Sequence, residues 1–231
     1  MNIIEIDNLR FGWPKQAELL INIEKFTLAA AQTLFLYGAS GSGKSTFLSL
    51  LTGINTPFPG ATLKILGTDL TQLNGPSRDQ FRANNIGYIF QQFNLIPYLS
   101  VLDNVLLACN FSPLRRANVG SDPYAKAAQL LEKLQLSADF FATPVTELSV
   151  GQQQRVAAAR ALIGEPALII ADEPSSALDQ DNCRIFIDLL LSQCCKSNSA
   201  LLFVSHDRSL QPLFDAHLNL SDFNHAAGSK L

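Results

Sequence analysis

Hydrophobic and polar residues alternate in two stretches of the first third of the chain. These are IIEIDNLRF, residues 3–11, and ATLKIL, residues 61–66. Such alternation is typical of a strand with one buried face, so we expect half-buried antiparallel strands here. Three other runs are apolar throughout: TLFLY at 33–37, ALIIA at 167–171 and ALLFV at 200–204. They predict central strands that are buried on both faces.

Apolar residues recur at helical spacing after the glycine-rich stretch GSGKST, residues 41–46. Phe47, Leu48 and Leu51 would share one face of a helix that ends at Gly53.

A further helix is predicted over residues 122–136, DPYAKAAQLLEKLQL. Asp122 is placed to cap it, and Pro123 fits a first turn, where its missing N–H is not needed. The expected apolar stripe consists of Tyr124, Ala127, Ala128, Leu131 and Leu134.

The order of the elements indicates the fold class. Strands alternate with helices at both ends of the chain, which predicts an α/β fold with a mostly parallel sheet. The alternating strands add an antiparallel β subdomain, and the middle of the chain reads as helices and loops only. We expect one domain over 1–231, with a core of 1–91 and about 148–231 and an inserted α-helical subdomain of about 92–147.

Composition narrows the choice of partners. Of the 231 residues, 47% are hydrophobic, and the formal net charge of −3 lacks the basic excess of nucleic-acid-binding domains. We therefore expect no nucleic-acid partner. Apolar runs reach only about five residues, against the roughly 20 that a membrane-spanning helix needs.

Location and redox state follow from two further features. The first residues show no basic region followed by an apolar one, so we predict no secretory signal and a cytoplasmic setting. No pair of cysteines has CxxC spacing, which favours free reduced thiols at Cys109, Cys183, Cys194 and Cys195.

GASGSGKST, residues 38–46, fits the pattern G-x-x-x-x-G-K-[ST] between a predicted strand and a predicted helix. A glycine-rich turn alone would not explain the lysine and serine that follow the last glycine. In a phosphate-binding loop, Lys44 reaches the outer phosphates and Ser45 offers its hydroxyl to Mg²⁺. The backbone N–H groups turn toward a polyphosphate at Gly38, Gly41 and Gly43. The sequence thus predicts a P-loop NTPase core of the RecA-like kind.

Two carboxylates end the predicted strand in ALIIADEPSSALD, residues 167–179. Open α/β sheets bind ligands at the carboxyl edge of their strands, so a solvated acidic turn is the less favoured interpretation beside a P-loop. We assign Asp172 to the metal shell and Glu173 to the base that activates water.

Phosphate-loop proteins include kinases, GTPases, helicases and transport ATPases, and the NKxD motif of GTPases is missing here. LSVGQ, residues 148–152, resembles the LSGGQ signature of the ATP-binding subunits of ABC transporters. The other elements of that family occur in the expected order over almost the whole chain. The resemblance therefore implies an ATPase whose hydrolysis of ATP is coupled to transport.

The resemblance implies roles for residues outside the P-loop. YIFQQFNLIP is similar to the Q-loop, with Gln91 preferred and Gln92 as the alternative. FVSHD places His206 where the family has its switch histidine. LRFGWPK, residues 9–15, is similar to the stretch with the adenine-stacking aromatic, for which we choose Trp13 over Phe11.

SALD, Ser176–Asp179, is similar to the D-loop. The predicted catalytic residues are then Glu173, His206 and Gln91, and the predicted metal ligands are Ser45, Gln91 and Asp172. The predicted nucleotide-binding residues are Trp13, Gly38, Ala39, Ser40, Gly41, Ser42, Gly43, Lys44, Ser45, Thr46, Ser149, Gly151, Gln152 and Asp179.

In the family, two subunits pair head to tail, and the signature of one covers the nucleotide of the other. Ser149 and Gly151 would then face the partner's γ-phosphate, and Ser149 with Gln152 also fits a capping box. Val150 stands where most members have glycine. A β-branched residue disfavours positive φ, so we expect negative φ at Val150, backbone freedom from Gly151, and valine methyl groups directed into the helical subdomain.

The sequences of these motifs are most similar to those of the lipoprotein-release and macrolide-efflux group of ABC subunits. The resemblance implies ATP and Mg²⁺, a second copy of the chain, and a separate membrane permease at the cytoplasmic face of the inner membrane. The permease would dock on FNLIPYLS, residues 93–100, through exposed Phe93, Leu95 or Tyr98. Two alternatives remain: a soluble ATPase of the same superfamily, and a non-catalytic partner subunit, against which Glu173 and His206 argue.

Overall fold

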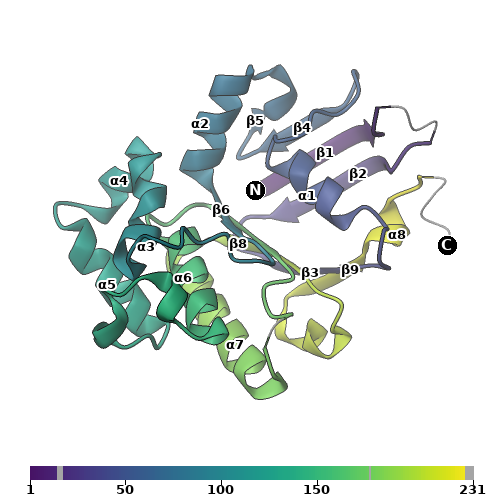
Figure 1. Ribbon diagram of the computed structural model, residues 1–231. Coiled ribbons are helices and arrows are strands. Elements are labelled where there is room, and N and C mark those ends of the chain that lie inside the picture. Colours follow the sequence, from purple (N-terminus) through teal and green to yellow (C-terminus); the bar gives the residue numbers. More distant parts are fainter. Residues whose placement is uncertain (15–17, 177, 227–231) are drawn as a thin grey trace.

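The computed structural model describes residues 1–14, 18–176 and 178–226. Two sheets organise the chain (Figure 1). The antiparallel sheet has the order β2-β1-β4-β5, with the bounds Asn2–Phe11 (β1), Ile21–Ala29 (β2), Thr62–Ile65 (β4) and Thr68–Asp69 (β5). The parallel sheet has the order β6-β7-β8-β3-β9, with the bounds Thr33–Tyr37 (β3), Ile86–Ile89 (β6), Leu168–Asp172 (β7), Ala200–Val204 (β8) and Ala216–Asn219 (β9).

The α-helices fill the connections between the strands. They are Lys44–Leu51 (α1), Gly75–Asn85 (α2), Val101–Asn110 (α3), Pro113–Val119 (α4), Pro123–Lys133 (α5), Val150–Leu162 (α6), Gln180–Ser197 (α7) and Leu220–Phe223 (α8). Short 3-10 helices span Leu70–Gln72, Ala138–Phe140, Val145–Glu147 and Arg208–Leu213. The predicted α/β class with parallel and antiparallel sheets is confirmed. No helix among the described residues is long and apolar enough to cross a membrane.

The apolar strands are buried on both faces, as predicted. In β8, Leu201 and Phe203 belong to the core shared with α6 and α7, whereas Leu202 and Val204 face the core shared with α1 and the antiparallel sheet. Alternate side chains of one strand thus contribute to two cores, because successive side chains point to opposite faces of a sheet. The parallel sheet is the layer that joins the two halves of the molecule.

Between residues 92 and 147 the structure has α3, α4, α5 and two of the 3-10 helices. The cap of α5 is as predicted, since the Asp122 side chain accepts a hydrogen bond from Ala125 N. The predicted apolar stripe is wrong at Tyr124, which is exposed. Its position in the first turn of α5 lies beyond the packed core, and its hydroxyl donates to the carboxylate of Asp103 at 3.3 Å.

The described cysteines are free, as predicted, and Cys195 is the exposed one of the four. In a parallel sheet the carboxyl ends of all strands meet at one edge, so the segments that follow β3, β6, β7 and β8 converge there. This convergence brings the P-loop, the Gln91 segment, the carboxylate pair and His206 to one edge of the sheet.

Candidate functional site

The P-loop joins β3 to α1 and turns through two glycines with positive φ, +78° at Gly41 and +98° at Gly43. Other residues adopt such conformations at a cost, so these glycines are needed for backbone freedom. Gly38 is needed for space and not for backbone freedom, because a Cβ there would lie 2.9 Å from Ser42 Oγ. The loop leads into the N-terminus of α1, whose free N–H groups and dipole favour an anion.

Lys44 is the first residue of α1 and is buried. Its Nζ donates to the carbonyls of Gly38 at 2.9 Å and Ala39 at 3.0 Å, so the ammonium is folded onto the loop that it would share with a phosphate. Burial lowers the pKa of Lys44, and the nearby carboxylates of Glu173 and Asp172 oppose this shift. The cation is therefore held between the P-loop and the acidic pair.

Asp172 ends β7 close to hydroxyl groups. Tyr88 donates to its Oδ2 at 3.4 Å, and the Ser45 hydroxyl is near enough to lower the pKa of Asp172 slightly. Burial raises the pKa of Asp172, and the like charge of Glu173 raises it further. Burial and Asp172 together also raise the pKa of Tyr88. Sequence reasoning missed Tyr88, because only the pairing of β6 with β7 places it beside the carboxylate.

Glu173 has a strained backbone, with φ of +46°. Such a conformation at a residue other than glycine costs on the order of 1 to 3 kcal/mol and is frequent at functional sites. A hydrogen bond from Glu173 N to Val204 O, 2.9 Å long, fixes it to the end of β8. The side chain is mostly buried, and its Oε1 lies 2.6 Å from His206 Nε2. The carboxylate is thus aimed by a histidine from the neighbouring strand end.

A cavity of about 550 Å³ opens over the P-loop. Four residues that sequence reasoning did not predict line it: Tyr37, Arg208, Asn219 and Ser221. The Arg208 guanidinium lies 4.7 Å from the centre of the Tyr37 ring. These four residues come from segments far apart in the sequence, so no local pattern pointed to them. The complete lining is Tyr37, Gly38, Ala39, Ser40, Gly41, Ser42, His206, Arg208, Asn219 and Ser221.

The signature segment begins α6. Ser149 caps the helix, its Oγ accepting from Gln152 N at 3.4 Å, while Gln152 Oε1 accepts from Ser149 N at 2.8 Å. The predicted capping box is therefore confirmed. Val150 has no positive φ, also as predicted.

Two expectations for this segment are wrong. Val150 does not point into the helical region but has 47% of its surface exposed, because the first turn of α6 projects past the packed residues. Gly151 lies within the helix and has no positive φ, so it gives the turn no special freedom. A Cβ at Gly151 would meet only Leu178 Cδ2, at 3.6 Å, which leaves the backbone open to an approaching group.

Comparison with known proteins agrees with this geometry. The family model described as ABC transporter matches residues 21–176. The chain belongs to the ABC transporter family.

Relatives span nearly the full chain. It is 38% identical over 198 residues to the lipoprotein-releasing system ATP-binding protein LolD of Hydrogenovibrio crunogenus, covering 85% of this chain and 83% of that protein. It is 34% identical to the ABC transporter ATP-binding protein YbbA of Escherichia coli K12, with 95% and 94% coverage. A dimeric structure of the ATP-binding cassette MJ0796 bound to ADP and Pi superposes with a TM-score of 0.82 at 29% identity, covering 94% and 93% of the two chains. This protein is an ATP-binding, ATP-hydrolysing ABC subunit.

Other predicted residues of this ABC subunit, Trp13, Gln91 and Asp179, are not among the described residues that line the P-loop cavity. Trp13 is partly exposed and packs edge-on against buried Phe11, but it does not line the cavity. Gln91 and Gln92 are both exposed just beyond β6. The Asp179 side chain caps α7 by accepting a hydrogen bond from Asn182 N at 2.9 Å. Hydrogen bonding to Asn182 lowers the pKa of Asp179. Two residues of the predicted motifs, Lys15 and Ala177, lie outside the described residues.

The predicted docking segment is partly wrong. Phe93 is buried, because its backbone at φ +59° turns the ring toward the core that contains α3 and α6. Leu95 is partly buried, and Tyr98 is exposed.

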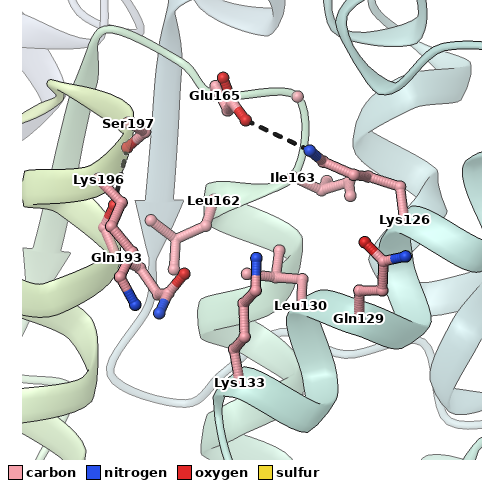
Figure 2. Close-up of a pocket in the computed structure, with 11 residues that line it drawn as sticks. Lys126, Gln129, Leu130, Lys133, Leu162, Ile163, Glu165, Gln193, Lys196 and Ser197 are labelled. Carbon is pink, nitrogen blue, oxygen red and sulfur yellow. Dashed lines mark hydrogen bonds and ion pairs between the residues drawn. The ribbon is translucent and has the colours of Figure 1, made fainter.

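A smaller cavity of about 80 Å³ lies between α5, α7 and the end of α6, away from the P-loop (Figure 2). Lys126, Lys133 and Lys196 surround it, and Lys126 pairs with Glu165 at 3.6 Å. Lys133 is the last residue of α5 and Lys196 lies in the last turn of α7, where cations are stabilised by the helix dipole. None of the predicted site residues is among the residues that line this cavity.

Proposed function

We propose that this ABC subunit binds ATP between two copies of itself, arranged head to tail, and couples its hydrolysis to a separate membrane permease. One observation supports the head-to-tail pairing of two copies. Among the described residues, those that line the P-loop cavity include none from the signature 148–152, while Ser149 and Val150 are exposed at the start of a helix. An exposed helix N-terminus that does not serve its own nucleotide site is available to the nucleotide of a second copy.

The roles of the residues follow from their contacts. Lys44 would leave the two loop carbonyls and meet the outer phosphates, because a phosphate offers a stronger partner than a neutral carbonyl. Glu173, aimed by His206, would accept the proton of the attacking water. Trp13 is proposed to stack on the adenine and Gln91 to sense the γ-phosphate end of the site.

The residues fit a magnesium ion. The Ser45 hydroxyl lies near enough to Asp172 to lower its pKa, and the oxygens of both residues are the hard donors that Mg²⁺ prefers. The described residues contain no cluster of three or more His, Cys, Asp or Glu that would form a dedicated metal cage, which suits an ion held mainly by nucleotide phosphates. When bound, the ion would neutralise phosphate charge, with Ser45, Asp172 and Gln91 around it.

The permease group is proposed from the relatives. LolD of Hydrogenovibrio crunogenus is named for lipoprotein release, so a permease of the lipoprotein-release or efflux type is the partner we propose. The subunit would then lie peripherally at the cytoplasmic face of the membrane, since no described helix could span it. The alternative is an ABC-type ATPase that works without a permease.

Sedimentation of two variants tests the pairing. Glu173→Gln keeps the shape of the side chain but cannot take a proton, so with ATP and Mg²⁺ it should form a stable dimer. Adding Ser149→Arg should return it to monomers that still bind ATP, because only the signature is altered. A double variant that dimerises as well as Glu173→Gln alone would refute the head-to-tail arrangement.

A further inference from the structure

The cavity of about 80 Å³ between α5, α7 and the end of α6 lies far from the ATP-binding edge of the sheet. The segment after α6 leads into the start of β7 at Leu168, and the segment after α7 leads into the start of β8 at Ala200. The cavity is therefore at the amino edge of these strands, whereas the P-loop and the carboxylate pair follow carboxyl ends. A molecule bound here would not compete with ATP.

The lining of the cavity is positively charged. Lys126 and Lys133 come from α5 and Lys196 comes from α7. Lys126 and Glu165 are 3.6 Å apart, which is longer than a hydrogen bond, and Lys133 and Lys196 form no ion pair with any described residue. Even with about half a negative charge at the carbonyl end of each helix, three ammonium groups outweigh the one carboxylate.

Gln193 adds a buried amide to this lining. The residue is only 8% exposed, and its backbone oxygen accepts from Ser197 Oγ at 3.0 Å. Its side-chain amide forms no hydrogen bond with any described residue, although buried amides in proteins nearly always have a partner. Figure 2 shows the end of Gln193 and the ammonium group of Lys133 pointing toward one another across the cavity. The amide is therefore available to a molecule held between the two helices.

The residue types in the lining indicate the chemistry of that molecule. A carboxylate is bound best by the planar fork of an arginine, and no arginine is among the described residues of the lining. Ammonium groups are compact point charges that suit a phosphate group, whose oxygens also accept hydrogen bonds from an amide. About 10 to 15 Å³ of such volume holds one water molecule, so this cavity has room for a phosphate group.

An apolar wall completes the cavity and accounts for the rest of the molecule. Leu130 lies on the α5 side, and Leu162 and Ile163 lie at the end of α6. Carbon atoms esterified to the phosphate would be removed from water against these side chains. The lining thus fits a phosphate monoester better than a free inorganic ion.

We propose that this cavity binds the phosphate group of a phosphate monoester. Lys133 and Lys196 would hold the charge, and the Gln193 amide would donate to a phosphate oxygen. The site goes beyond ATP hydrolysis and does not depend on a permease. Its ligand would contact the end of α6, the helix that begins at the signature segment after Ser149. The monoester could be soluble or the headgroup of a lipid, and the test separates these two sources.

The side-chain amide of Gln193 reports directly on the site. In ¹⁵N-glutamine-labelled protein with ADP and Mg²⁺ saturating the P-loop, its signal is identified by its loss in Gln193→Met. Glycerol 3-phosphate should shift this signal saturably if the ligand is soluble. If the ligand is a lipid, only dihexanoyl phosphatidic acid should do so, with dihexanoyl phosphatidylcholine as the control. No shift from either monoester, or an equal shift from potassium chloride at the same ionic strength, would overturn the proposal.

Charge variants test the lysines with whichever monoester responds. Lys133→Gln and Lys196→Gln should each weaken its binding about 10-fold or more, because each removes a charged hydrogen-bond donor. Glu165→Gln should strengthen binding, because the cavity then loses its negative charge. Lys64→Gln, on exposed β4, is the matched control with the same change in net charge. Equal losses in Lys64→Gln and the two cavity variants, or weaker binding by Glu165→Gln, would refute a specific site.

Gln193→Met tests the amide itself, because methionine has a similar shape and no polar group. Calorimetry with ADP and Mg²⁺ present should show about 10-fold weaker binding of the monoester. The Tm without the monoester should not fall, since the side chain has no hydrogen bond to lose within the described chain. A lower Tm with unchanged affinity would assign the amide a structural role and refute the proposed contact.

Discussion

Adding one methyl group to the glycine of the signature segment, Gly151, should raise stability and lower activity. Gly151 is the second residue of α6, and a Cβ there would make one ordinary contact, with Leu178 Cδ2 at 3.6 Å. Alanine therefore fits without strain. Because alanine is favoured over glycine in a helix interior by about 0.8 to 1.0 kcal/mol, Gly151→Ala should stabilise the free chain by up to about 1 kcal/mol.

For a protein of this size, 1 kcal/mol corresponds to a Tm increase of about 2 to 4 °C, which differential scanning calorimetry resolves. The same methyl group would stand between the helix N-terminus and the phosphate of the second copy. Loss of one preorganised N–H contact to a reacting group costs on the order of 100-fold in rate. We therefore expect Gly151→Ala to melt higher and to hydrolyse ATP far more slowly.

Val150→Ala is the matched control. Val150 is 47% exposed and precedes Gly151 in the same turn, so its truncation should change Tm little and preserve steady-state hydrolysis. A lower Tm for Gly151→Ala would contradict the helical geometry at that residue. Native hydrolysis by Gly151→Ala, or a greater loss of hydrolysis in Val150→Ala, would refute the close approach of a phosphate at Gly151.

Three further outcomes are expected. Lys44→Ala should abolish ATP binding in calorimetry, because the cation bonded to the P-loop carbonyls is removed; unchanged affinity would exclude the site. Asp172→Asn should raise the Tm of the nucleotide-free protein, since it removes a charge that burial disfavours, and should lose the further increase with Mg²⁺ and ATP; a wild-type increase would refute its metal role. Gly87→Ala should lower the free energy of unfolding, measured by urea denaturation, by about 1 to 3 kcal/mol, because its Cβ would overlap Ala161 O. Gly75→Ala, with open space around it, should not.

The sequence alone determined the features that depend on neighbours a few residues apart. Two helix caps were predicted, that of α6 by Ser149 with Gln152 and that of α5 by Asp122. Each joins residues three positions apart, and the structure has both caps. The helix after the P-loop and the apolar central strands followed from local spacing. The wrong expectation at Gly151 came from assigning it a turn conformation, although a helix that starts at Val150 already includes it.

The tertiary structure decided the contacts between distant segments. Only the strand order brings Tyr88 to Asp172 and His206 to Glu173. The strained backbone of Glu173 is likewise visible only in the structure. The burial of Phe93 was equally hidden in the sequence. The physical reason is that local hydrogen bonds are set by the spacing of residue types, whereas burial and charge compensation depend on which remote segments the fold packs together.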